Sequence, residues 1–177
     1  MTTVLDNAIR FFAAGIPKGQ PRPRAFARFI GGKAIARVYD AGSAEGWKSD
    51  IALAARFHRP AEPIAGPVRI EVEFLMPRPK SHFNRLGLKD SAPYWHIAKP
   101  DIDNALKAVC DALTTLRFWH DDAQVCALVS SRRYADPDVS GPGAWIEIHE
   151  LSRRVAGVKQ PQLVNGDPNA DGHGTQG

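Results

Sequence analysis

Hydrophobic and polar residues alternate most regularly between Pro67 and Met76, and this two-residue period predicts a β-strand. The apolar face of the strand carries Val68, Ile70, Val72, Phe74 and Met76. Its other face carries Arg69, Glu71 and Glu73. The two glutamates could in principle join a metal site, but a solvent-exposed strand face is the simpler interpretation.

Shorter apolar runs predict five further extended segments. Two of them, at 25–30 and 34–39, flank Gly31 and Gly32, and a glycine pair between two such runs is typical of a hairpin turn. The other segments are expected at 8–14, 124–134 and 144–150. The last two are separated by Asp136-Pro137 and Pro142-Gly143, which favour turns.

Two stretches have the period of a helix. Residues 43–57 are expected to begin at Ser43 as N-cap and to turn Trp47, Ile51 and Ala54 inward. A second helix should start after Lys99, and its apolar stripe comprises Ile102, Leu106, Val109 and Leu113. The elements together predict an α+β fold, a single small domain in which a mixed or antiparallel sheet packs against two main helices.

Composition fits one soluble domain. The chain has 177 residues, of which 44% are hydrophobic and 24% charged. We expect the folded domain to cover 1–154 and the Gly-, Asn- and Gln-rich segment 155–177 to be a disordered tail. The two cysteines, Cys110 and Cys126, lack metal-site spacing. No apolar run is long enough to span a membrane and no signal-peptide pattern is found, so a cytoplasmic protein without membrane contact is expected.

The second helix begins with acidic residues. Pro100 disfavours the helical conformation at Lys99, which makes Asp101 a natural N-cap, and Asp103 follows in the first turn. Asp103, Lys107 and Asp111 are four residues apart and share one face. Taken alone, the stretch is best interpreted as a capped amphipathic helix with an ion pair, because aspartate is common at helix starts.

A second acidic pair, Asp121 and Asp122, changes that balance. It precedes the strand expected at 124–134, and a helix followed by a short loop can fold the strand back along the helix. The two acidic pairs could therefore meet. Clustered carboxylates repel one another unless a cation lies between them, and hard oxygen ligands suit Mg²⁺, with Mn²⁺ possible.

Basic residues add a possible nucleic-acid surface. The net charge is +4 with a pI near 9.3, which alone is weak evidence because many basic proteins bind no nucleic acid. Three prolines stiffen the segment 15–24, and the long irregular stretch 77–99 leads directly to Asp101. Both segments could contact DNA phosphates or could be ordinary solvated loops. The candidate DNA-binding residues are Lys18, Arg22, Arg24, Arg28, Lys80 and Lys99.

Several motifs in a fixed order resemble the RusA family of Holliday-junction resolvases. They are Lys-Pro-Asp-Ile-Asp-Asn at 99–104, Lys107, Asp-Ala-Leu at 111–113, Asp-Asp-Ala-Gln-Val at 121–125 and the opening segment 15–24. The resemblance covers about 9–150 and implies a small homodimeric, Mg²⁺-dependent endonuclease of phage or prophage type that cuts four-way DNA junctions.

The resemblance also implies residue roles. Asp101, Asp103 and Asp122 would bind the metal and act in catalysis, Lys107 would be the catalytic lysine, and the adjacent Asp121 is a further possible ligand. Asn104 would support the site by a hydrogen bond at the helix start. Two alternatives stay open: a nuclease for other branched DNA, such as forks, flaps or packaging intermediates, and a non-catalytic protein that binds DNA structures.

Overall fold

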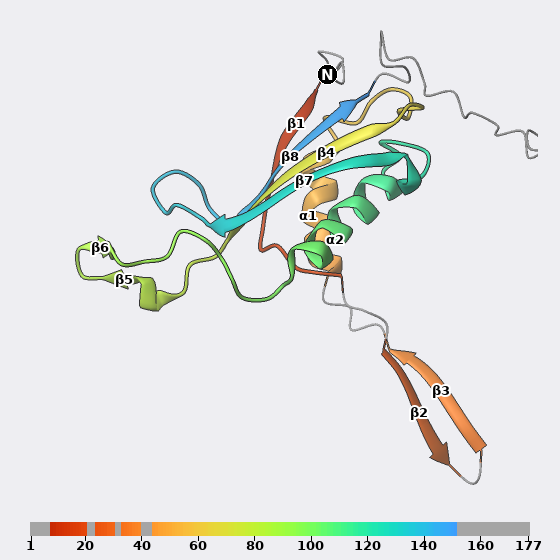
Figure 1. The fold of residues 1–177 in the computed structure, drawn as a ribbon, viewed down its shortest axis with the longest axis horizontal. Helices are drawn as coiled ribbons and strands as arrows, with labels where there is room; N and C mark the ends of the chain where they lie inside the picture. The colour runs from red at the N-terminus through yellow and green to blue at the C-terminus, as the bar shows by residue number, and fades with distance from the viewer. Residues whose placement is uncertain (1–7, 21–23, 31–32, 40–43, 152–177) are drawn as a thin grey trace, which may run out of the picture.

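The computed structural model describes residues 8–20, 24–30, 33–39 and 44–151, with only the backbone described for 24–30 and 33–39. Its centre is a four-stranded sheet in the order β1-β8-β4-β7 (Figure 1). The strands are β1 (Ile9–Ala14), β4 (Val68–Met76), β7 (Val125–Tyr134) and β8 (Gly143–Glu150). The β4–β7 pair is parallel, whereas β8 pairs antiparallel with both β1 and β4, so the sheet is mixed.

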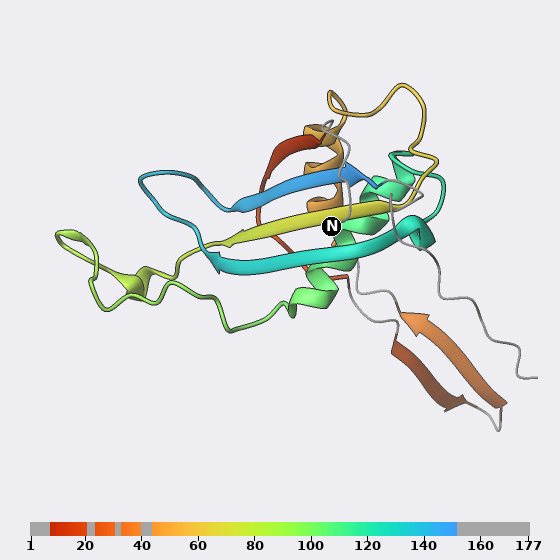
Figure 2. The same cartoon turned by 45° about the horizontal axis from the view of Figure 1, so that its top comes forward.

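Two helices cover one face of this sheet, α1 (Glu45–Ala55) and α2 (Ile102–Thr115) (Figures 1 and 2). The parallel β4–β7 pair requires a crossover connection, and α2 lies within it. The alternation along β4 buries Ile70, Val72 and Phe74 against the helices. Trp47 and Ile51 of α1 meet them in the same core, as the sequence predicted. The α+β class, the mixed sheet and the two main helices are thereby confirmed.

The helix boundaries differ from the expectation in detail. α1 begins at Glu45 with Ala44 as N-cap, while Ser43 lies outside the described residues. The buried face of α2 is formed by Ala105, Ala108, Val109, Ala112 and Leu113. The predicted stripe is correct at Val109 and Leu113, whereas Leu106 is only partly buried. Small alanine side chains let α2 approach the sheet closely, which a pattern of large apolar residues does not reveal.

Two segments extend from this body. β2 (Arg24–Ile30) and β3 (Lys33–Tyr39) form the predicted hairpin, which projects beyond the helices (Figure 1). The stretch 77–100 contains a short 3₁₀ turn, η1 (Lys80–His82), and a minimal hairpin of β5 (Phe83–Asn84) and β6 (Gly87–Leu88). Its last part returns along β7 through a bridge between Trp95 and Arg133 before entering α2.

No helix in the described part of the chain has the length and apolar character needed to cross a bilayer. The expected tail, 155–177, falls outside the described residues. The proposed boundary of the folded domain near residue 154 therefore stays a prediction.

Candidate active site at the start of helix α2

The entry to α2 is held by Arg132 of β7. Its Nη1 donates to the carbonyl oxygen of Ala98 at 2.8 Å and also to that of Pro100, the residue before Asp101. The neighbouring backbone strengthens this connection, since the His96 N–H donates to the Arg132 carbonyl at 3.4 Å. A guanidinium with several fixed donors suits this task, because it can bind two carbonyl groups at once. The strand therefore fixes where the helix begins.

Asp101 and Asp103 lie on that first turn and both are exposed. Asp101 is the N-cap, as predicted, with extended backbone angles of φ −67° and ψ 148°. Its backbone carbonyl accepts the first helical hydrogen bond, from Ala105, but its carboxylate makes no capping bond. The helix N-terminus favours negative charge at both positions. A carboxylate that is not needed for capping can bind a ligand.

The segment 15–20 lies directly beside this turn. The Gln20 N–H donates to the Asn104 carbonyl at 2.9 Å. Gly19 is so close that an added Cβ would stand 3.0 Å from the Asn104 Cβ and 3.1 Å from the Pro100 Cβ. This close contact brings the exposed Lys18 next to the acidic helix start. The hydrogen bond from Gln20 uses only the backbone of Asn104, so the supporting role of its side chain stays a prediction.

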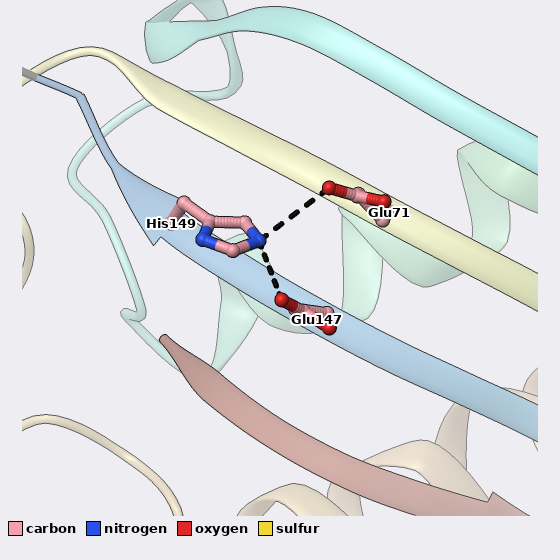
Figure 3. A group of neighbouring side chains, drawn as sticks. All are labelled: Glu71, Glu147 and His149. Atoms are coloured by element: carbon pink, nitrogen blue, oxygen red, sulfur yellow. Dashed lines mark ion pairs between the residues drawn. The ribbon is translucent and has the colours of Figure 1, made fainter. Parts of the chain in front are cut away.

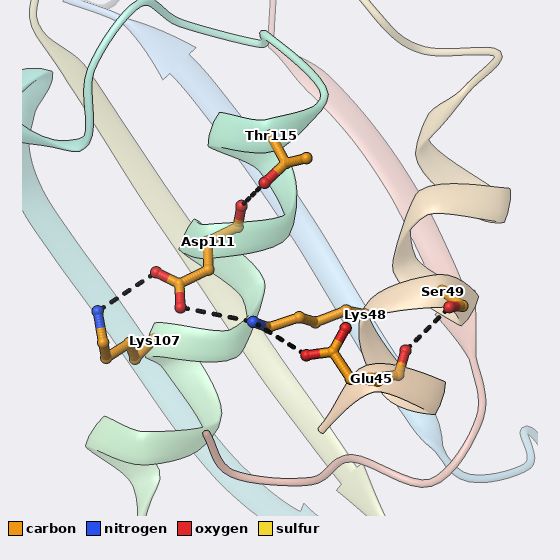
Figure 4. Close-up of polar contacts among 6 residues, drawn as sticks. All are labelled: Glu45, Lys48, Ser49, Lys107, Asp111 and Thr115. Carbon is orange, nitrogen blue, oxygen red and sulfur yellow. Dashed lines mark hydrogen bonds and ion pairs between the residues drawn. The ribbon is translucent and has the colours of Figure 1, made fainter. Parts of the chain in front are cut away.

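Lys107 and Asp111 continue the same face of α2. Lys107 Nζ lies 3.3 Å from Asp111 Oδ1, while Lys48 Nζ of α1 lies 3.7 Å from the other oxygen, Oδ2 (Figure 4). Lys48 is also 3.7 Å from Glu45. The Lys107 side chain is 60% exposed, against 21% for Lys48. Asp111 thus pairs with one mostly buried and one exposed ammonium, so it keeps Lys48 as a partner when Lys107 turns away.

Asp121 and Asp122 have different surroundings. Asp121 caps the 3₁₀ turn η2 (Asp122–Gln124): its Oδ1 accepts from the Ala123 N–H at 2.8 Å, and the Gln124 side chain accepts from the Asp121 N–H at 3.0 Å. One carboxylate oxygen is therefore engaged in a capping box. The exposed Asp122 begins η2, which packs against α2, and its charge acts on Cys110. Burial of Cys110, with the charges of Asp111 and Asp122, raises the pKa of its thiol to about 11.

The predicted metal ligands do not all converge in the single chain. Among the described residues, only Glu71, Glu147 and His149 bring three potential ligand atoms within 4.8 Å of one another. Asp101 and Asp103 lie at the first turn of α2, whereas Asp122 begins η2, and its charge acts on Cys110, about two helical turns after Asp103. Whether these three acids share a metal stays a prediction.

The candidate DNA-binding residues fall into two groups. Lys18, Lys80 and Lys99 are exposed, on the segment beside α2, on η1 and directly before Pro100. Arg24 and Arg28 lie on β2, whose side chains are not described, and Arg22 lies outside the described residues. All three exposed lysines precede the acidic turn in the chain, and Lys99 lies two residues before Asp101.

Two residues of this site were missed from the sequence. They are Arg132, which anchors the entry to α2, and Lys48, which pairs with Asp111. Both act across the fold, on residues that lie 32 and 63 positions away in the chain. Asp111 could be recognised because its partner Lys107 is four residues away on the same helix, a spacing visible in the sequence.

Comparison with known proteins defines the class of protein to which this fold and site belong. The family model described as Endodeoxyribonuclease RusA matches residues 14–148. The chain is also 36% identical over 149 residues to the uncharacterized protein YqaN of Bacillus subtilis (strain 168), covering 82% of this chain and 99% of YqaN.

The family match points to a nuclease. The chain belongs to the RusA endodeoxyribonuclease family, which confirms the resemblance carried by 99–104 and its companion motifs. The matched region contains the whole acidic turn, Lys107 and the pair Asp121–Asp122.

Proposed function

We propose that this protein is a Mg²⁺-dependent endodeoxyribonuclease that resolves Holliday junctions by paired strand cleavage in DNA recombination and repair. It would be a resolvase of the prophage type and would act as a homodimer. The observation that carries the proposal is the first turn of α2. There, two exposed carboxylates precede Lys107 in a chain of the RusA family, and Asp101 makes no capping bond.

The donor set at this turn fits Mg²⁺, with Mn²⁺ as a possible replacement. Magnesium in nuclease-type sites is usually held by one or two carboxylates, with water and substrate phosphate as the remaining ligands. Asp101 and Asp103 meet that requirement within one chain. When bound, the ion would stabilise charge on the attacked phosphate and on the leaving 3′-oxygen. Asp122 would join the site once DNA is bound, and Asp121 is a further possible ligand through Oδ2, the oxygen that its capping bond does not use.

Lys107 is the cation that we assign to the transition state. Its exposed ammonium can leave Asp111, which stays paired with Lys48, and turn toward a phosphate at the helix start. A positioned charge of this kind is worth most where phosphate charge develops during reaction. Asn104 would support the turn by hydrogen bonding. The six basic residues named above, from Lys18 to Lys99, would contact the DNA backbone around the cut.

A homodimer follows from the substrate. A four-way junction has two-fold symmetry and is resolved by cuts in two strands. Two copies of the chain related by a two-fold axis would present two equivalent acidic turns to the two strands. Analytical ultracentrifugation of the full chain, with and without junction DNA, measures this directly.

A substrate panel tests the activity. A synthetic four-way junction, a fork, a flap and a linear duplex are incubated with the protein in Mg²⁺, Mn²⁺ or EDTA. We expect paired symmetric cuts in the junction alone, lost in EDTA. Equal cutting of forks or flaps would show that the substrate is branched DNA in general and not the four-way junction alone. Junction binding without cutting under any divalent ion would overturn the nuclease assignment in favour of a DNA-structure-binding protein.

A further inference from the structure

The sheet face turned away from the helices carries a cluster of titratable residues that the nuclease proposal does not use. Ile70 and Val72 of β4, and Ile146 and Ile148 of β8, are buried on the helix side. The residues between them therefore point to the opposite face of the sheet. These residues include Glu71, Glu147 and His149 (Figure 3).

The register brings two like charges together. Glu71 of β4 is paired directly with Glu147 of β8. Like charges directly opposite on neighbouring strands destabilise a sheet unless a cation compensates them. Arg10, beside Glu147, holds the pKa of the Glu147 carboxyl below its usual range, so this carboxylate is ionised at neutral pH.

His149 lies between the two carboxylates. Its Nε2 is 2.7 Å from Glu147 Oε1 and 3.5 Å from Glu71 Oε1 (Figure 3). The side chain is only 9% exposed, yet Nδ1 has no hydrogen-bond partner among the described residues, and the close Nε2 contacts lack hydrogen-bond angles. A buried polar group without such a partner is costly and indicates a missing ligand. Here Nε2 lies within ion-pair distance of two carboxylate oxygens, whereas Nδ1 has no such contact.

We propose that Glu71, Glu147 and His149 form a binding site for a divalent cation of the zinc class, separate from the acidic turn of α2. Ligands held at ~2.1 Å from a metal stand about 3.0–3.5 Å apart. The separation of His149 Nε2 from Glu71, 3.5 Å, lies in this range, and that from Glu147, 2.7 Å, would widen slightly around an ion. One imidazole with two carboxylates is a zinc ligand set, whereas Mg²⁺ prefers oxygen alone.

The remaining surroundings allow an ion to enter. A hollow of about 260 Å³ adjoins both glutamates and is also lined by Trp145 and Ser131. Three protein ligands leave one zinc position open, which water in this hollow would fill. Arginines now compensate the carboxylates: Arg10 Nη2 lies 2.7 Å from Glu147 Oε1, and Arg69 Nη2 lies 2.7 Å from Glu71 Oε1. Both arginine side chains reach solvent and can turn away when the cation arrives.

Zinc titration by calorimetry tests the site. The full chain carries Asp101→Asn, Asp103→Asn and Asp122→Asn, so that the α2 acids contribute no binding and the nuclease proposal is not at issue. We expect one Zn²⁺ site, weakened at least about tenfold by His149→Gln and by Glu71→Gln. Glutamine keeps a hydrogen-bonding amide at each position but is a poor zinc ligand.

Two matched controls separate the site from non-specific binding. Glu73→Gln removes a carboxylate from the same strand face that pairs with Arg133 instead, and His58→Gln removes an exposed histidine stacked on Phe11. Both controls should bind zinc as the parent does. Thermal unfolding in EDTA establishes that each variant is folded. Equal zinc affinity in parent, His149→Gln and Glu71→Gln would overturn the proposal and leave an ionic network of His149 with two glutamates.

Discussion

Arg132 donates a hydrogen bond to the carbonyl oxygen of Pro100, the residue directly before Asp101. The bond joins β7 of the sheet to the entry of α2. The same guanidinium also reaches the Ala98 carbonyl, so two points of the incoming chain are fixed. The position of the first acidic turn therefore depends on a residue that lies about thirty positions later in the sequence.

Replacement of Arg132 should weaken Mg²⁺ activation. Arg132→Met keeps an apolar stem but removes both bonds, so the turn carrying Asp101 and Asp103 loses its anchor. Loss of a group that orients metal ligands typically costs 10–100-fold, and we expect a shift of about that size in the Mg²⁺ concentration giving half-maximal junction cleavage. Arg133→Met is the matched control, because Arg133 pairs with Glu73 on the other face of the sheet. Equal Mg²⁺ requirements in the two variants would contradict the anchoring role.

Loss of the acids and lysine should separate cleavage from binding. Asp101→Asn, Asp103→Asn and Lys107→Met should each lower the cleavage rate by roughly 100-fold or more, since each removes a charge at the reacting phosphate. Junction affinity, measured by gel shift in EDTA, should change little, because these side chains do not supply most of the phosphate contacts. Asp138→Asn, at an exposed loop acid, serves as the control. An Asp103→Asn variant that cuts at the parental rate would contradict the assignment of Asp103 as a catalytic metal ligand.

The sequence predicts local features of this protein well. The alternation of 67–76 and the helical period after Lys99 depend on nearby residues, and the structure confirms both. The order β1-β8-β4-β7 brings together strands far apart in the chain, which periodicity alone does not specify. Glu71 illustrates the limit: its exposed strand face is predictable, whereas its neighbours Glu147 and His149 depend on the register between β4 and β8.

The same distinction applies to the candidate site. Asp101 as N-cap and the Lys107–Asp111 pair follow from spacing along one helix. The relative position of Asp122 does not, because it depends on how η2 packs against α2. A short helix-to-strand connection could place the Asp122 carboxylate either near Cys110 or near the first turn of α2.

Cys110 offers a direct probe of that position. Burial and the charges of Asp111 and Asp122 raise the pKa of its thiol to about 11, so it should react slowly with iodoacetamide near pH 8. In a Cys126→Ser background, Asp122→Asn should lower this pKa and speed alkylation several-fold, whereas Asp90→Asn, in the distant loop, should not. Saturating Mg²⁺ should have the same accelerating effect if the ion binds beside Asp122. An unchanged rate in Mg²⁺ would restrict the ion to Asp101 and Asp103.

His96 should make stability depend on pH in a predictable direction. Burial lowers its pKa below 6.5, and the nearby charge of Arg132 lowers it further. In the unfolded chain the ring titrates near 6.5, so below that pH the unfolded state binds the proton more readily than the folded state. The contribution to stability is therefore complete above about pH 6.5 and declines as the pH falls toward the folded-state value.

The variant His96→Phe tests this direction. It keeps an aromatic ring against Tyr134, whose ring centroid lies 4.9 Å from that of His96, but it cannot titrate. Urea unfolding between pH 5 and 8 should show a smaller loss of unfolding free energy at low pH for this variant than for the parent, with His58→Phe as the exposed control. Parallel curves for parent and His96→Phe would contradict the lowered pKa.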